Sequence, residues 1–374
     1  MVYFDSASTT KPSKGALEAF TDCAAITYAN PSSQHSAGKA AREAVEDVRR
    51  IIAATIGSHA DEIVFTSGGT EAANLAILGA CAANRGKNKI IISAVEHPAV
   101  YKTCSMLRES GYRVVTVSAT LDGTVDEKSL ASEIDDTVAI VSFMAVNNET
   151  GTVFPIRKIS RIVKSIDPGI PVHTDAVQAL CKIPLDVNDL GVDLLSVSAH
   201  KVHGIKGAGA LYIRNGTSVT PLYYGGEQER GMRPGTEAVP LIAAFGYAVS
   251  EAVANLDDYN KLIGELKSRL VFGLANAEGV VVNTKEGGIP HIVNFSVPGR
   301  KPGDVLTALS GEGYCVSRGA ACKTNHEHGP SMLMSFGLPV GIADTALRVS
   351  FSHENNAEEV EGFVRALVKI LICQ

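Results

Sequence analysis

The chain has 374 residues, of which 45% are hydrophobic and 20% charged, and its 34 Lys and Arg against 40 Asp and Glu give a net charge of −6. This composition is that of a globular protein and excludes the disordered, collagen-like and disulfide-stapled classes. The negative balance offers no general attraction to nucleic acid or to an anionic membrane, so we expect neither as a direct partner.

The seven cysteines include no CxxC pair. Their odd number and spacing favour neither a disulfide framework nor a zinc site, and they suit a reducing compartment. The first fifteen residues lack the basic and apolar segments of a secretory signal, and no run approaches the ~20 apolar residues that span a bilayer. We therefore expect a cytoplasmic protein.

Residues 1–213 alternate between helical and strand patterns. Apolar residues at helical spacing predict a helix over 37–56, which Ser36 would cap and Gly57 would end. Short apolar runs then alternate with helical segments such as 70–84 and 156–166; the runs are 62–66, 89–93, 113–117, 138–143, 194–198 and 209–213. This alternation predicts a mostly parallel sheet wrapped by helices, with ligands at the carboxyl ends of its strands.

The pattern changes after residue 213. A Gly-rich polar stretch precedes a long helical segment over 240–275 that could bridge two domains. The remaining elements are predicted as strands 291–297, 314–317 and 346–351 and helices 303–311 and 357–371, the last with Asn356 and Glu359 set like a capping box. We predict a large α/β domain over 15–255 and a smaller α+β domain formed by 1–14 and 256–374.

Two segments contain candidate residues for binding a phosphorylated ligand and reacting with it. Gly69 and Thr70 stand between a strand and a helix, where backbone N–H groups favour an anion such as phosphate, although an ordinary glycine turn explains them as well. Lys201 follows an apolar strand, with Ser198 and His200 beside it. Desolvation and nearby cations would suit this lysine for a Schiff base; the alternative is a solvated lysine in a turn.

Further polar residues follow other predicted strands. Asp175 could keep a pyridine nitrogen protonated and Gln178 could donate to a phenolate oxygen, although a helix cap also explains Asp175. His97 could stack on a ring or move protons, or be a structural histidine. Asn148 could bind a ligand oxygen or shape its turn.

Cys322 is the candidate nucleophile. It lies in a polar, glycine-containing loop beside Lys323 and other basic residues that favour a thiolate, whereas Cys315 lies in an apolar strand where a thiol most simply fills the core. His326 and His328 have no strong third ligand, so we expect a solvated loop and no metal.

Ten motifs in order along nearly the whole chain resemble those of the cysteine desulfurase family, which are fold-type I pyridoxal 5′-phosphate enzymes of the class V aminotransferase group. They are FDSASTT, NPSSQHSAG, FTSGGTEAANLAI, EHPAV, NNETGTVFPI, HTDAVQ, SAHKVHGIKG, GGEQERGMRPGTE, SRGAAC and ALRVSF. Ten ordered motifs are specific where one would be weak. The resemblance implies the fold-type I fold, pyridoxal phosphate as cofactor and a homodimer.

The resemblance also implies roles for residues around the cofactor ring. Lys201 would form the Schiff base, Asp175 would pair with the pyridine nitrogen, and His97 would stack on the ring. Gln178 and Asn148 would contact the side of the phenolic oxygen.

Other residues would bind the phosphate and the substrate. The phosphate would be held by Gly69, Thr70, Ser198, His200 and, from the other subunit, Thr236. Arg348, with Asn148, would hold the carboxylate of the substrate, although an Arg on a strand edge can instead form a surface ion pair.

The implied reaction removes sulfur from L-cysteine, giving L-alanine and a persulfide on Cys322. Lys201 would act as general base and His97 would help to move protons. The persulfide would pass to an acceptor protein, either an iron–sulfur scaffold or a tRNA thiolation enzyme. The alternatives are a selenocysteine lyase or another class V enzyme, such as an aminotransferase, and a catalytically idle scaffold subunit.

Several positions depart from the family pattern. Ser6 and Ser8 replace an Asn and an Ala in the opening motif, and Ile205 replaces a Pro. Ala320 replaces a Ser before the cysteine, and Lys323 follows it where a small hydroxyl residue is common. The HEHG stretch also differs from the family pattern, and the closing KILICQ lacks the tail with which housekeeping members dock a scaffold protein. The sequence therefore does not identify the sulfur acceptor.

Overall fold

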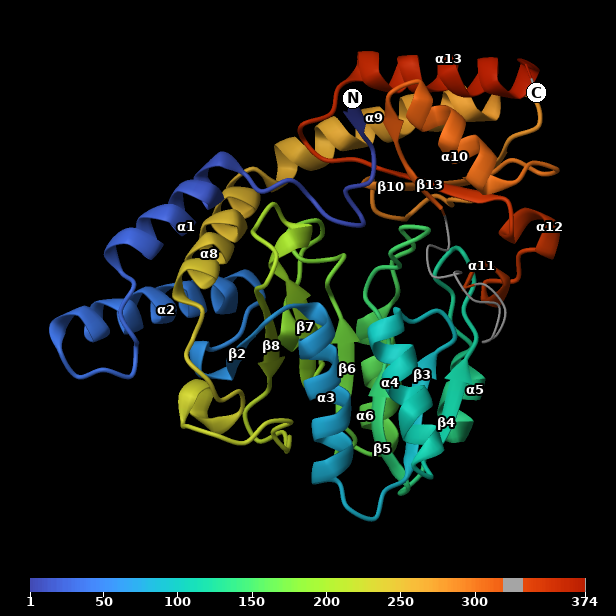
Figure 1. The fold of residues 1–374 in the computed structure, drawn as a ribbon. Coiled ribbons are helices and arrows are strands. Elements are labelled where there is room, and N and C mark those ends of the chain that lie inside the picture. The colour runs from blue at the N-terminus through green and yellow to red at the C-terminus, as the bar shows by residue number, and fades with distance from the viewer. Residues whose placement is uncertain (319–331, 374) are drawn as a thin grey trace.

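The computed structural model describes residues 1–318 and 332–373, and its centre is a seven-stranded sheet (Figure 1). The strands lie in the order β2-β8-β7-β6-β5-β3-β4, and only β8 runs antiparallel to its neighbours. Their bounds are β2 Ile63–Thr66, β3 Lys89–Ser93, β4 Arg113–Val117, β5 Val138–Ser142, β6 Val172–Asp175, β7 Leu194–Ser198 and β8 Gly209–Ile213. The predicted mostly parallel α/β sheet is confirmed.

Helices cover both faces of this sheet, which explains why its central strands are buried throughout. One face packs on α3 (Gly69–Ala83) and α4 (Pro98–Glu109). The other face carries α6 (Ile156–Ile166), with α5 (Glu127–Glu133) and α7 (Val187–Leu190) beside it. This layering leaves the carboxyl ends of the parallel strands as the open edge.

Three longer helices pack together at the β2 end of the sheet (Figure 1): α1 (Lys14–Ile26), α2 (Ser36–Thr55) and α8 (Val239–Ala254). The predicted cap of α2 was wrong, because the Nδ1 atom of His35, not Ser36, accepts from Gly38 N. The predicted single helix over 240–275 was also wrong. The chain bends by 72° at Asn255, and α9 (Leu256–Ala275) leaves in a new direction.

A four-stranded antiparallel sheet lies above the large one in Figure 1. It has the order β12-β13-β10-β9 and consists of β9 Val281–Val282, β10 Ile292–Ser296, β12 Ser317–Arg318 and β13 Ala346–Ser350. It packs against α9, α10 (Pro302–Gly311) and α13 (Ala357–Cys373) in a separate hydrophobic core. The predicted Asn356–Glu359 capping box is confirmed, because each backbone N–H donates to the other side chain.

The first residues of the chain join this second layer. Strand β1 (Val2–Tyr3) pairs in parallel with β11 (Tyr314–Cys315), and Asp5 bridges to Ser350. The predicted single strand over 314–317 is therefore two short strands, because β11 pairs with β1 and β12 pairs with β13. The fold class is confirmed, while the domain boundaries at 14/15 and 255/256 stay a prediction.

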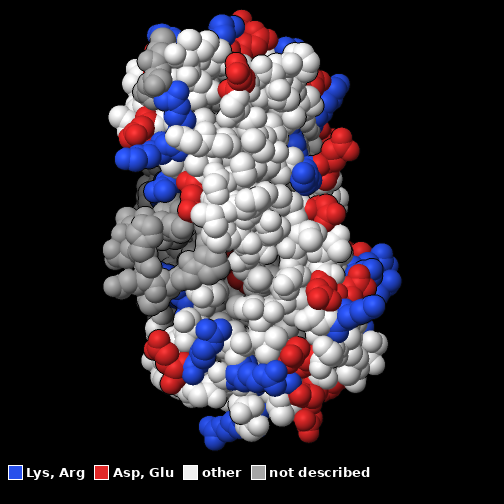
Figure 2. Space-filling model, turned by 90° about the vertical axis from the view of Figure 1, so that its right-hand side faces the viewer, with Lys and Arg blue, Asp and Glu red and all other residues white. Residues whose placement is uncertain are grey.

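Charges of both signs are scattered on the face shown in Figure 2, around an uncharged central stretch. Among the described residues no single helix is long and apolar enough to cross a bilayer, and only the bent pair α8–α9, taken together, meets that test by length and composition.

Candidate active site

The site lies where the carboxyl ends of the parallel strands meet the first residues of the chain and strand β13. Strand β7 leads through the short helix η2 (Ala199–Lys201) to Lys201, and β6 ends in Asp175. His97 precedes α4 and Asn148 follows β5, while Arg348 enters from β13. The alternation of strand and helix in the sequence therefore brings four of the predicted residues to one edge, and β13 of the second sheet adds Arg348.

Lys201 is turned inward, not solvated. Its Nζ atom donates to the carbonyl oxygens of Ala7 at 2.6 Å and Ser8 at 2.7 Å. Burial and then the charge of Arg348 lower the pKa of this amine to about 8, against the opposing pull of Asp175. A larger fraction of Lys201 is consequently the neutral, nucleophilic amine at neutral pH than for a solvated lysine.

Asp175 is buried at the end of β6, and its Oδ1 atom accepts a hydrogen bond of 3.0 Å from Val177 N. Burial raises its pKa, and the nearby charges of His97 and Lys201 oppose that rise. Asp175 caps a turn, as the alternative interpretation supposed, yet its carboxylate also faces two site residues. A buried carboxylate of this kind is ionised most readily opposite a cation.

His97 caps α4: its Nδ1 atom accepts from Ala99 N at 3.1 Å. The neutral ring therefore carries its proton on Nε2. Burial lowers the pKa of His97, so the neutral ring dominates. The preceding residue, Glu96, anchors this loop because its Oε1 atom accepts from Ser93 Oγ at 2.6 Å and Met144 N at 2.8 Å. Burial raises the pKa of Glu96 to about 8.

The turn before α3 is a cradle for a small anion. A Cβ at Gly69 would lie 2.6 Å from Val177 Cγ2, so only glycine fits this close approach. The first N–H groups of α3 have no acceptor within the helix. Ser198 Oγ is buried and has no hydrogen-bond partner among the described residues. His200 contacts Thr9 Oγ1 through Nδ1 at 3.1 Å, and burial lowers its pKa to about 4.

Arg348 is buried in the middle of β13's sheet, so the alternative of a surface ion pair was wrong. Its Nη2 atom donates to Asp5 Oδ1 at 2.8 Å and Ser8 Oγ at 2.6 Å, and its Nη1 atom to Asn148 O at 2.9 Å. Arg348 Nε and Asn148 Oδ1 are buried without partners among the described residues. A donor and an acceptor therefore remain available there for a ligand.

Gln178 lies next to Lys201 but is oriented by the protein. Its Nε2 atom donates to Ala7 O at 2.9 Å, and its Oε1 atom accepts from Lys182 Nζ at 2.8 Å. Because a carbonyl only accepts and a lysine amine donates, this pair of contacts fixes which end of the amide is which.

Two of the predicted residues are exposed in this structure. Thr236 is exposed in the loop before α8, and Thr70 is exposed at the start of α3. Cys322 lies outside the described residues. Cys315 in β11 is partly buried, so its thiol fills the core in part.

Sequence reasoning missed Asp5, Ser8 and Lys182. Asp5 and Ser8 belong to the opening motif FDSASTT, which carried the resemblance but no assigned side-chain role. Lys182 stands four residues after Gln178, a spacing at which side chains can meet across one helical turn. That spacing was the available signal.

These residues fit pyridoxal phosphate. The anion cradle at Gly69, the unpartnered Ser198 Oγ, the buried carboxylate of Asp175 and the poised amine of Lys201 are the donor set that its phosphate, pyridine nitrogen and aldehyde require.

Comparison with known proteins agrees with this geometry. The family model described as aminotransferase class-V matches residues 2–363. The chain is 38% identical to "Cysteine desulfurase IscS" of Dictyoglomus turgidum, covering 99% of this chain and 94% of that one. It is 37% identical to the protein of the same name from Methanosarcina thermophila, covering 99% and 92%. A solved structure named "NifS-like protein" matches with a TM-score of 0.94 at 36% identity, covering 100% of both chains.

Proposed function

The chain belongs to the aminotransferase class-V family and acts as a pyridoxal-phosphate-dependent cysteine desulfurase, and we propose that Lys201, His97 and Cys322 carry out its chemistry. The observation that carries this proposal is the inward-facing Lys201, whose amine is held by two backbone carbonyls opposite the buried carboxylate of Asp175. A buried amine with a lowered pKa beside a charged partner is typical of a lysine that reacts.

The cofactor would be held at both ends by residues of this site. Gly69 and Ser198 would bind the phosphate, with His200 beside them, and Asp175 would hold a proton on the pyridine nitrogen. When bound, pyridoxal phosphate supplies an electron-accepting ring that takes up the charge developing at the substrate Cα. His97 would cover the ring with its neutral imidazole.

The substrate would be positioned by Arg348 and Asn148. A carboxylate gains charge-assisted hydrogen bonds from a guanidinium, and the unpartnered Nε atom of Arg348 is one free donor for it. Lys201, with its pKa near 8, then takes the proton from Cα. His97 Nε2 is placed to move a proton to or from substrate groups.

The sulfur leaves as a persulfide. The thiolate of Cys322 attacks the sulfur of L-cysteine, so that an S–S bond forms while the bond from Cβ to sulfur breaks. The electron pair of that bond stays with the carbon skeleton, which collects protons and leaves as L-alanine. No external oxidant is required, because the substrate carbon is reduced as the sulfur is oxidised.

The finer parts of the function are proposals. We propose a cytoplasmic homodimer in which Thr236 of one subunit reaches the phosphate in the other; the exposure of Thr236 supports this, because no described residue of its own chain buries it. We propose that the persulfide passes to an iron–sulfur scaffold protein, which the names of the relatives support, rather than to a tRNA thiolation enzyme.

Borohydride reduction of the purified enzyme, followed by peptide mapping, tests the proposal. Only an imine is reducible, so the cofactor should become fixed to the peptide that contains Lys201. Lys206, which follows in the same segment, is the matched control, and Lys206→Ala should leave the labelling unchanged. Attachment at Lys206, or none, would overturn the assignment.

A further inference from the structure

Lys182 is a buried lysine that contacts the buried side chain of Gln178. The residue is only 6% exposed. It follows Cys181, whose φ of 54° is unusual for a residue other than glycine. This left-handed backbone conformation directly precedes the buried Lys182. Such strain persists where the surrounding structure requires it.

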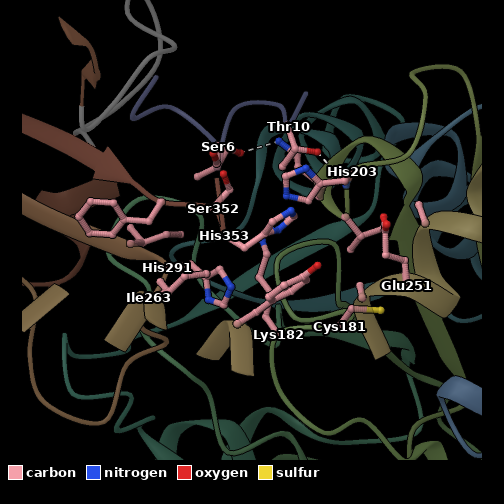
Figure 3. A pocket seen from close by; sticks show the side chains of 18 residues that line it. Ser6, Thr10, Cys181, Lys182, His203, Glu251, Ile263, His291, Ser352 and His353 are labelled. Carbon is pink, nitrogen blue, oxygen red and sulfur yellow. Dashed lines mark hydrogen bonds between the residues drawn. The ribbon is translucent and has the colours of Figure 1, made fainter. Parts of the chain in front are cut away.

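The lysine lines a cavity of about 40 Å³ that also contacts Lys201 (Figure 3). The side chains of Lys182, His203, His291 and His353 converge on it, and Glu251 lies at its rim. His291 Nδ1 is buried without a partner among the described residues. The space suits water rather than an organic ligand.

No ordinary ion pair explains this lysine. Among residues 1–318 and 332–373, no carboxylate forms a salt bridge with Lys182, and the neighbouring charges of Lys201 and Arg348 disfavour its charged form. Burial and these charges lower its pKa to about 7. Burying an amine costs free energy unless a hydrogen bond or an ion pair offsets the loss of water.

The specific contact is the carboxamide of Gln178. These hydrogen bonds form a connected chain. Lys182 Nζ donates to Gln178 Oε1 at 2.8 Å, and Gln178 Nε2 donates to Ala7 O at 2.9 Å. The same Ala7 oxygen accepts from Lys201 Nζ at 2.6 Å. A donor on Oε1 polarises the amide and leaves the second N–H of Nε2 free.

We propose that Lys182 is a positioning residue for the cofactor: by holding Gln178 Oε1, it directs the second N–H of Gln178 to the phenolic oxygen of pyridoxal phosphate. This inference rests on the proposed function, because it uses Gln178 as a ligand of that oxygen. Without Lys182 the amide is a weaker donor and turns more freely, so the phenolic oxygen becomes more basic.

The test is the pH titration of the cofactor absorption band in the holoenzyme, recorded without cysteine. Lys182→Met keeps the length of the side chain and removes its donor. We expect the titration midpoint to rise by about half to one pH unit, a threefold to tenfold change that corresponds to one net hydrogen bond. Lys267→Met is the control. Lys267 Nζ donates to the carbonyl oxygens of Gly288 and Ile289, which lie outside the site. The titration midpoint of the cofactor in this variant should not change.

A double-mutant cycle separates positioning from a general structural effect. In a Gln178→Ala background, Lys182→Met should produce no further shift, because the partner through which it acts is gone. A shift that persists at full size, or an unchanged midpoint in the single variant, would overturn the proposal. If Lys182→Met fails to fold, Lys182→Leu, which also lacks a donor, takes its place in the same cycle. Since no cysteine is present, a failure of persulfide formation leaves this readout intact.

Discussion

The guanidinium of Arg348 donates to the carboxylate of Asp5 across 2.8 Å, although the two residues are 343 positions apart. This partly buried pair joins the first residues of the chain to strand β13 and holds Arg348 near Lys201. The hydroxyl of Ser8 accepts from the same Nη2 atom at 2.6 Å and donates to Asp5. The opening motif thereby orients the residue that we propose to bind the substrate.

Arg348→Ala should weaken substrate capture. Removing one partner of a desolvated charge pair costs about 2–5 kcal/mol, so kcat/KM for alanine release should fall by at least thirtyfold, mainly through KM. Initial rates over a series of L-cysteine concentrations measure this. Arg348→Lys, which keeps the charge but not the fork of donors, should recover only part of the loss. A drop in thermal stability with unchanged KM would assign Arg348 a purely structural role.

Asp175→Asn should retain the fold and lose most of the activity. The amide is nearly isosteric but carries no charge, so it cannot hold the ring nitrogen protonated by charge pairing. Circular dichroism should match the wild type, while kcat for alanine release should fall by several orders of magnitude, as expected for loss of a charge partner in a reacting site. Wild-type turnover in this variant would contradict the role assigned to Asp175.

Uptake of pyridoxal phosphate by the apoprotein should follow the ionisation of Lys201. Its pKa is lowered from 10.5 to about 8, and only the neutral amine attacks an aldehyde, so the fraction of reactive amine rises as pH increases towards about 8 and then levels off. The rate measured by absorbance from acidic to alkaline pH should show this plateau. A rate that kept rising to the pKa of an ordinary lysine would mean that Lys201 is solvated before the cofactor binds.

The large sheet could be predicted closely because buried parallel strands are continuous apolar runs. The run at 89–93 and that at 194–198, for example, match β3 and β7, which are buried throughout. The bend at Asn255 could not be predicted, since apolar spacing continues through it and only the packing of α8 and α9 into different cores reveals it.

Asp175 and Lys201 could be predicted as site residues because each stands at or just after the carboxyl end of an apolar strand. Asp5 and Ser8 escaped prediction because their roles depend on contacts with a residue far along the chain. Ser8, for instance, contacts Arg348 from 340 positions away. No periodicity in the sequence records such a contact.

Mass spectrometry of the protein after incubation with L-cysteine tests the central claim most directly. The mass should increase by one sulfur atom, located on Cys322, and alanine should accumulate. Cys322→Ser should bind the cofactor and L-cysteine normally, as seen in its absorption spectrum, yet carry no added sulfur and release almost no alanine. Cys315→Ser is the matched control and should behave like the wild type in both assays. Alanine release by Cys322→Ser at the normal rate would contradict persulfide transfer to Cys322.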